Sequence, residues 1–132
     1  MVTGPQHARP TRVAIVDSDE DFASVAASGL RFADGLEVVA IAPPPIDVID
    51  RVVAWRADIV VLDLHLYGTD TGHALIGELK SRGIDVVLTT EDPAATIVDH
   101  CPVHDKGRSR TALYALVDAV RRRRQPGAAY AD

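Results

Sequence analysis

Hydrophobic residues along the chain gather in short continuous runs rather than in strictly alternating patterns. Four runs rich in β-branched residues, and a weaker fifth, occupy positions 13–16, 38–42, 59–62, 86–88 and 102–105. Continuous runs are typical of strands in a parallel sheet. Helices cover both faces of such a sheet, so successive side chains are all buried. The pattern therefore predicts five parallel strands.

The segments between the runs carry apolar residues at helical spacing. The residues that share one helical face are Phe22, Val25, Ala26, Leu30 and Ala33, then Ile49, Val52 and Val53, then Leu75, Ile76 and Leu79, and finally Leu113, Leu116, Val117 and Val120. Asp92 followed by Pro93 is typical of an N-cap and first helical position, and predicts a short helix through about Asp99. Alternating strands and helices predict an α/β fold, a doubly wound parallel sheet with helices on both faces.

Length and composition narrow the class of protein. The chain has 132 residues, which suits one domain, and 19 acids against 14 bases give a net charge of −5. This excess of acids argues against direct nucleic-acid binding, since phosphates must be neutralised by bases. No apolar run approaches the roughly 20 residues of a membrane helix, and Cys101 is the single cysteine. We expect a cytoplasmic domain at 11–124, a disordered leader at 1–10, and a tail or linker start at 125–132.

Chemistry-bearing residues follow the apolar runs. Ligands of open parallel sheets bind at the carboxyl ends of the strands, and here those ends carry Asp17, Asp63, Thr89 and Lys106. The loop at 17–21 holds four acids, which would repel a nucleotide phosphate that needs a cradle of backbone N–H groups. Carboxylates suit Mg²⁺, and a lysine and a hydroxyl suit phosphoryl oxygens. The residues predict Mg²⁺-assisted phosphoryl transfer with an aspartate as acceptor.

Four segments, in this order, resemble the response-regulator receiver domain of bacterial two-component signalling. They are Ala-Ile-Val-Asp at 14–17, the third run with its aspartate at 57–64, Val-Leu-Thr-Thr at 87–90 and Asp-Lys at 105–106. The resemblance extends from about Arg12 to Arg123. It implies a flavodoxin-like fold, in which a five-stranded parallel sheet has the order 2-1-3-4-5.

The resemblance also implies a mechanism. A histidine kinase would phosphorylate Asp63, and Thr89 and Lys106 would contact the phosphoryl oxygens. Asp17, Asp63 and the backbone carbonyl of His65 would bind the Mg²⁺ cofactor, with Asp19 as a further candidate. Phosphorylation would repack the face of the fourth helix, fifth strand and fifth helix, which would also serve a homodimer, an output domain or a partner protein. Such a domain is a signalling switch rather than an enzyme.

Four departures from the family pattern predict an atypical receiver. Ser18 replaces the second of two adjacent acids, so we expect weaker Mg²⁺ binding. Tyr67 and Thr71 replace a proline and a glycine after the acceptor, and Gly72 comes one residue late. The threonine and the lysine are only 17 positions apart, which predicts a shortened fourth helix. Val103 replaces an aromatic switch residue, so the usual relay is not expected.

Other readings of the sequence stay open. A pseudo-receiver would use the same fold for protein interaction or dimerisation without phosphate. A small flavodoxin-like enzyme ranks below both, since the chain lacks a phosphate-cradling glycine loop. A cobalamin motif at 63–68 lacks its later signatures, and the residues around Cys101 do not have the spacing of a zinc site. The four arginines at 121–124 fit a solvated helix end.

Overall fold

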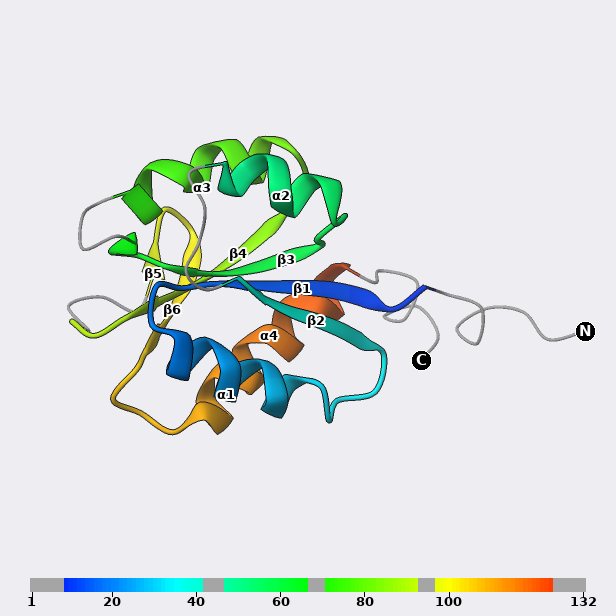
Figure 1. Ribbon diagram of the computed structural model, residues 1–132, viewed down its shortest axis with the longest axis vertical. Coiled ribbons are helices and arrows are strands. Elements are labelled where there is room, and N and C mark those ends of the chain that lie inside the picture. The colour runs from blue at the N-terminus through cyan, green and yellow to red at the C-terminus, as the bar shows by residue number, and fades with distance from the viewer. Residues whose placement is uncertain (1–8, 42–46, 67–70, 93–96, 125–132) are drawn as a thin grey trace, which may run out of the picture.

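The computed structural model describes residues 9–41, 47–66, 71–92 and 97–124. In these ranges a parallel sheet is covered by helices on both faces (Figure 1). The parallel strands are β1 (Thr11–Val16), β2 (Leu36–Ile41), β3 (Ile59–Asp63), β4 (Asp85–Thr90) and β6 (Cys101–Asp105). The helices are α1 (Glu20–Leu30), α2 (Val48–Ala54), α3 (Thr71–Ser81) and α4 (Arg110–Arg124). None of the helices described is long and apolar enough to cross a membrane.

The strand order confirms the predicted doubly wound sheet. The parallel strands are arranged as β2-β1-β3-β4-β6, which is the order 2-1-3-4-5 expected for the five runs. A short sixth strand, β5 (Ile97–Val98), pairs antiparallel with the outer edge of β6. Because the long strands run in one direction, their carboxyl ends meet at one edge of the sheet. The residues predicted to carry chemistry all follow or end strands at this edge.

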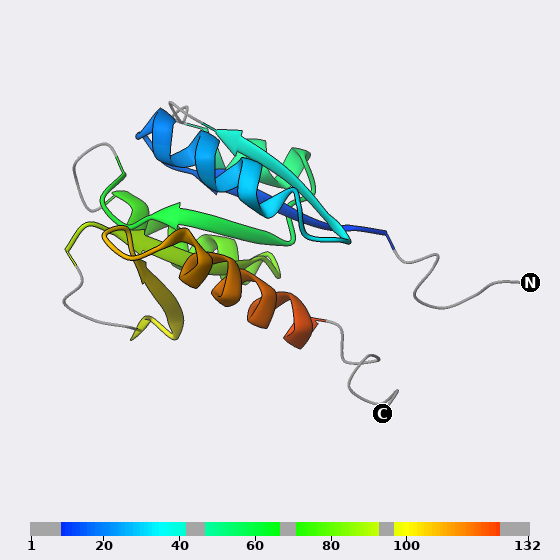
Figure 2. The same cartoon turned by 90° about the horizontal axis from the view of Figure 1, so that it is seen from below.

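The core has two layers because successive residues of a strand point to opposite faces of the sheet. Val16, Leu62 and Leu88 pack under α2 and α3, whereas Ile15 and Val61 pack under α1 and α4. Figure 2 shows α1 and α4 on one face, and residues of the two helices contact each other. Helices therefore cover both faces, as predicted.

The prediction of a helix that continues to Asp99 is wrong, because the chain forms a short strand before that residue. Ile97 and Val98 form β5, and a two-residue turn at Asp99 and His100 leads into β6. Asp99 has φ 49° and His100 has φ 65°, the left-handed values that a tight hairpin turn needs. The hairpin satisfies backbone groups along the edge of β6 that would otherwise lack partners. Residues 93–96, where the predicted helix starts, lie outside the described residues.

An ionic cluster closes the amino end of the sheet. The Asp58 carboxylate accepts hydrogen bonds from Arg9 Nη2 at 2.7 Å, the Arg12 backbone N–H at 2.9 Å and Arg124 Nη2 at 3.3 Å. Arg124 also pairs with Asp85 at 2.8 Å. Arg9 lies in the expected leader, and its largely exposed side chain pairs with Asp58. Residues 1–8, Tyr67 and the tail at 125–132 lie outside the described residues.

Candidate functional site

Three of the predicted site residues meet at the carboxyl edge of the sheet. Lys106 Nζ lies 2.8 Å from Asp17 Oδ2 and 3.7 Å from Asp63 Oδ2. Asp17 follows β1, Asp63 ends β3 and Lys106 follows β6, so three strands contribute one side chain each. Asp17 is 1% exposed and Asp63 is 8% exposed. The sheet thus holds two carboxylates and an ammonium that are each almost entirely buried.

Each carboxylate also fixes the loop that follows it. Asp17 Oδ1 accepts a hydrogen bond from the backbone N–H of Asp19 at 2.8 Å. Asp63 Oδ1 accepts one from the backbone N–H of His65 at 3.1 Å. In these turns one carboxylate oxygen is used locally. The second oxygen of each residue is the one nearer to Lys106, so both Oδ2 atoms face a shared space.

Asp17 and Asp63 are under-neutralised, because their two negative charges share the single positive charge of Lys106. Burial raises the pKa of Asp17, and the negative charge of Asp63 raises it further, while the hydrogen bonds from Lys106 and the Asp19 backbone act in the opposite direction. One ammonium therefore serves two acids. A further cation near these carboxylates would favour their charged forms. The site is electrostatically suited to bind a metal ion or another positive group.

Lys106 also contacts an aromatic residue that was predicted only as part of a helical stripe. Phe22 lies in the first turn of α1, and its ring centroid is 4.8 Å from Lys106 Nζ. An ammonium is attracted to the face of an aromatic ring at this distance. The Lys106 side chain is 9% exposed. The signal in the sequence was an aromatic residue directly after the acidic loop, which we assigned only to the helical stripe.

Thr89 lies beside Asp63, but the two side chains are not hydrogen-bonded. The parallel register pairs Asp63 with Thr89, and the Thr89 carbonyl accepts a hydrogen bond from Leu64 N at 2.9 Å. Thr89 is fully buried, and its hydroxyl has no hydrogen-bond partner within the described ranges. The backbone of Thr89 therefore anchors the loop after Asp63, while its hydroxyl is available for another contact.

The carboxylates open into a pocket of about 260 Å³. Its lining residues are Asp17, Ser18, Asp19, Asp63, His65, Glu91 and Lys106. Glu91, which follows β4, was not among the predicted site residues, although its place after a strand was visible in the sequence. Asp19 lines the pocket, but its carboxylate accepts a hydrogen bond from Phe22 N at 3.1 Å and so caps α1. Acids therefore dominate the pocket, with one lysine among its described residues.

The donor set fits a magnesium ion with few protein ligands. Mg²⁺ is commonly bound by one or two carboxylates, with water and phosphate oxygens at the remaining positions. Asp17 and Asp63 supply two carboxylates, and Ser18 supplies no third charge. Among the described residues no group of three His, Cys, Asp or Glu side chains is placed to hold a metal. The residues therefore fit a Mg²⁺ ion that relies on water and on a phosphoryl group for its other ligands.

Gly72, which comes one residue later than the glycine expected from the resemblance, lies close to the backbone that follows Asp63. A Cβ atom at Gly72 would lie 1.9 Å from the backbone oxygen of Asp63 and 2.8 Å from that of Leu64. No other residue can pack the start of α3 this closely against the loop after Asp63 without displacing that loop. The late glycine is therefore explained by a contact at the site.

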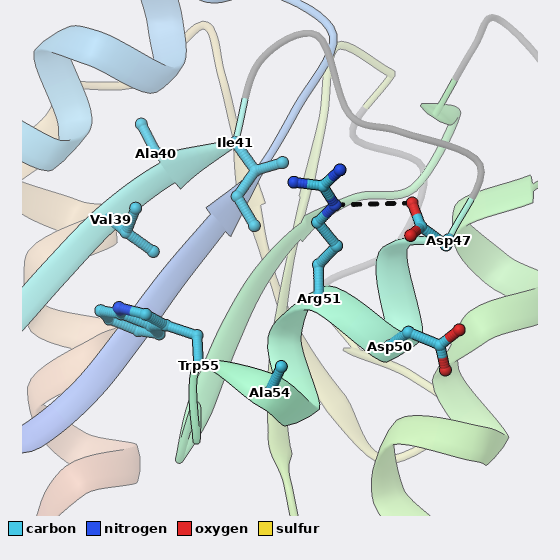
Figure 3. A pocket seen from close by; sticks show the side chains of 8 residues that line it. All are labelled: Val39, Ala40, Ile41, Asp47, Asp50, Arg51, Ala54 and Trp55. Carbon is cyan, nitrogen blue, oxygen red and sulfur yellow. Dashed lines mark ion pairs between the residues drawn. The ribbon is translucent and has the colours of Figure 1, made fainter.

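A second hollow lies away from these strand ends, between β2 and α2 (Figure 3). It measures about 780 Å³ and is lined by Val39, Ala40, Ile41, Asp47, Asp50, Arg51, Ala54 and Trp55. Arg51 and Asp47 point toward one another, with 3.6 Å between Nε and Oδ1, and Trp55 lies beside Val39. None of the predicted site residues lines this hollow. Its size alone does not make it the functional site, since much of its lining is apolar and Arg51 already pairs with Asp47.

Comparisons with known proteins agree on the fold. No protein-family model and no curated protein sequence matches this chain. A DNA-binding response regulator of the LuxR family from Staphylococcus aureus matches with a TM-score of 0.71 at 18% identity, over 83% of this chain and 98% of that one. The signal receiver domain of NarL from Mycobacterium tuberculosis matches with a TM-score of 0.70 at 20% identity, over 86% and 98%.

A third similar structure is the CheX–CheY complex with beryllofluoride and magnesium from Borrelia burgdorferi. It matches with a TM-score of 0.68 at 18% identity, over 89% of this chain and 93% of that chain. Each of these likenesses extends over more than four fifths of this chain. The chain therefore has the fold of response-regulator receiver domains.

Proposed function

We propose that this chain is a two-component receiver that accepts a phosphoryl group on Asp63. The observation that carries the proposal is the meeting of Asp63, Asp17 and Lys106 at the carboxyl edge, with 2.8 Å and 3.7 Å from the ammonium to the two acids. A structural ion pair would need one acid and one base. Here a second buried acid shares the lysine and opens into a solvent-accessible pocket.

The proposed reaction is an in-line displacement at phosphorus. A carboxylate oxygen of Asp63 attacks the phosphoryl group of a phosphohistidine on a kinase. A new P–O bond forms, the P–N bond breaks, and its electron pair leaves with the imidazole nitrogen, which takes a proton. Lys106 neutralises one phosphoryl oxygen, and the Thr89 hydroxyl lies on the neighbouring strand to contact another. Bound Mg²⁺ would neutralise the remaining phosphoryl charge, held by Asp17, Asp63 and the His65 carbonyl.

The same residues support an atypical receiver. Ser18 leaves the pocket without its second adjacent acid, and Asp19 is occupied as the cap of α1. Lys106 already pairs with Asp17, so a metal ion competes with it for that carboxylate. Val103 is partly buried and packs against the core layer under α2 and α3, where it has no ring to move. We therefore propose weak Mg²⁺ binding and a relay that does not use residue 103.

The partners follow from the same proposal. A histidine kinase supplies the phosphoryl group, and the face made by β6 and α4 contacts a second copy, an output domain or a partner protein. The domain acts within the cytoplasm as a switch, in the part of the chain between residues 11 and 124, with flanking leader and tail segments. Neither enzymatic turnover of a substrate nor direct nucleic-acid binding is part of this proposal.

The test is chemical phosphorylation followed by mass spectrometry. The folded chain is incubated with acetyl phosphate and Mg²⁺, and we expect an adduct of one phosphoryl group that is lost in Asp63→Asn. Asp50→Asn, at an exposed acid on α2, is the matched control and should keep the adduct. An adduct that persists in Asp63→Asn would show that the acceptor is another residue.

One observation favours a second candidate function. The 2.8 Å contact between Lys106 and Asp17 supplies an internal cation where receivers need a metal. A pseudo-receiver held in one conformation by this ion pair would serve as an interaction or dimerisation module. Absence of any adduct on the folded wild-type chain, with or without Mg²⁺, would favour this function over phosphotransfer.

A further inference from the structure

Two buried polar atoms lack hydrogen-bond partners on adjacent strands. They are Thr89 Oγ1 on β4 and His104 Nε2 on β6, and neither is bonded to any residue that the structure describes. Thr89 is 0% exposed and His104 is 2% exposed. Buried polar groups in native proteins are nearly always paired, so each unpaired atom needs an explanation.

The two side chains lie next to each other. The parallel register pairs Thr89 directly with His104. On β6, Val103 packs toward α2 and α3, so His104 points to the opposite face, under α1 and α4. On β4, Val87 packs under α1 and α4, and Thr89, two residues later, points the same way. Neighbouring strands are about 4.8 Å apart, and side chains at paired positions on one face are direct neighbours.

The two groups are chemically complementary. Burial lowers the pKa of His104, an effect that the nearby Arg108 and Lys106 charges reinforce and the Asp105 charge opposes. The buried imidazole is therefore neutral at neutral pH, with one nitrogen that donates and one that accepts. A threonine hydroxyl donates one proton and also accepts. One hydrogen bond between Thr89 and His104 satisfies both orphan atoms.

We propose that His104 is a positioning residue that holds the Thr89 hydroxyl until a phosphoryl group on Asp63 takes it over. This inference rests on the proposed function of Asp63. Thr89 is register-paired with Asp63 on one side and with His104 on the other. Its hydroxyl has one proton and donates to one acceptor at a time.

The pair provides this chain with a link from the acceptor site to its output face. When the Thr89 hydroxyl donates to a phosphoryl oxygen, His104 loses its partner and must reorient under α4 or bind water. The contact between α4 and β6 therefore senses the change directly. This link does not need an aromatic ring at residue 103, which explains how a receiver with Val103 there could still transmit a signal.

The first test detects the hydrogen bond itself. Nitrogen NMR of the histidine rings, assigned with His104→Gln, reports the Nε2 shift of His104 in the wild type and in Thr89→Val. We expect that Thr89→Val shifts this resonance toward the position of an unbonded ring nitrogen. Thr89→Ser, which keeps the hydroxyl, should retain the wild-type shift, and Thr90→Val is the matched control because Thr90 Oγ1 bonds to Asp92 instead. An unchanged Nε2 shift in Thr89→Val overturns the proposal.

The second test separates this inference from the proposed function. Beryllofluoride with Mg²⁺ is added to the wild type and to Asp63→Asn as a phosphoryl analogue. We expect it to move the His104 Nε2 resonance in the same direction as Thr89→Val, and only when Asp63 is present. Beryllofluoride that binds without moving His104 overturns the positioning role. Failure of beryllofluoride to bind, with the Thr89→Val shift intact, overturns the proposed function and leaves the hydrogen bond standing.

Discussion

The two ends of the sheet both gather acids and bases, but they balance them differently. At the amino end, Asp58 receives hydrogen bonds from Arg9, the Arg12 backbone and Arg124. One carboxylate thus has three donors, two of them cationic. The Asp58 side chain is only 11% exposed, and its bonding capacity is largely used. This cluster has the properties of a structural clamp that joins β1, β3 and α4.

At the carboxyl end the ratio is reversed. Asp17 and Asp63 share Lys106, and the pKa of Asp17 is raised by burial. Two carboxylates with one cation retain a net negative charge in a pocket. Saturation of the hydrogen-bonding groups, rather than the mere presence of ion pairs, distinguishes a binding site from a structural clamp. A saturated cluster stabilises the fold, whereas an under-neutralised one can bind a cation.

The largest effect on stability is expected from removing Asp58, the carboxylate at the centre of the clamp. Asp58→Ala leaves the Arg12 N–H without its partner and separates two arginines from the sheet, so we expect it to lower the free energy of unfolding by about 3 kcal/mol. Asp63→Ala removes repulsion with Asp17 together with its own contacts, and we expect a change below about 1 kcal/mol. Urea denaturation of both variants measures the difference. Equal losses would show that both clusters are structural.

The next effect lies at the start of α3. Gly72→Ala forces a methyl group against the Asp63 backbone oxygen, so we expect a loss of about 2 kcal/mol and a slower phosphorylation of Asp63. Gly77→Ala in the same helix is the matched control, because a Cβ there meets nothing within 4 Å. It should stabilise the protein by about 0.8 kcal/mol through helix propensity. Thermal unfolding and the acetyl phosphate assay report both quantities.

A smaller effect, on Mg²⁺ affinity, is expected when negative charge is added at the carboxyl end of the sheet. Ser18→Asp adds a carboxylate directly beside Asp17 in the pocket, and we expect Mg²⁺ to bind about tenfold more tightly, since one added charge near the ion contributes a kcal/mol or more. Ser24→Asp, at an exposed position on α1, adds the same charge away from this pocket. Calorimetric titration with Mg²⁺ compares the two variants. A similar gain in both would mean that net charge alone controls binding.

The smallest effect is the pH dependence of stability. The folded state holds the Asp17 proton more tightly than the unfolded state does, since its pKa lies above the ordinary 3.8. This contribution is fully present below pH 3.8 and is lost as the pH rises through the folded pKa. The stability of Asp17→Asn relative to the wild type should therefore increase over that pH range. Denaturation curves at several pH values test this, with Asp50→Asn as a control for the lost charge. A constant difference would contradict it.

The sequence predicted the strands and the positions of Asp17, Asp63 and Lys106 because these depend on local pattern. A continuous apolar run between polar segments has few alternatives to a buried strand, and the next residue then lies at the carboxyl edge. The three side chains meet because the parallel strand order brings the carboxyl ends of β1, β3 and β6 to the same edge of the sheet.

Other features depended on contacts that no local pattern encodes. Asp19 was a candidate metal ligand in the sequence, but the geometry of α1 uses its carboxylate as a cap. Asp99 and His100 adopt left-handed conformations that neither residue signals strongly, so a predicted helix end became a hairpin. The contact of Gly72 with Asp63 arises only when α3 packs on the acceptor loop.

Local sequence was therefore enough to predict the five parallel strands and the charged groups that follow them, because hydrophobic periodicity is a local property, whereas β5 was missed. Only the tertiary structure decided how those charges are balanced. Asp58 accepts hydrogen bonds from three donors, whereas Asp63 shares one lysine with Asp17. This difference depends on segments that are far apart in the chain. The same holds for Thr89 and His104, whose pairing exists because β4 and β6 lie side by side.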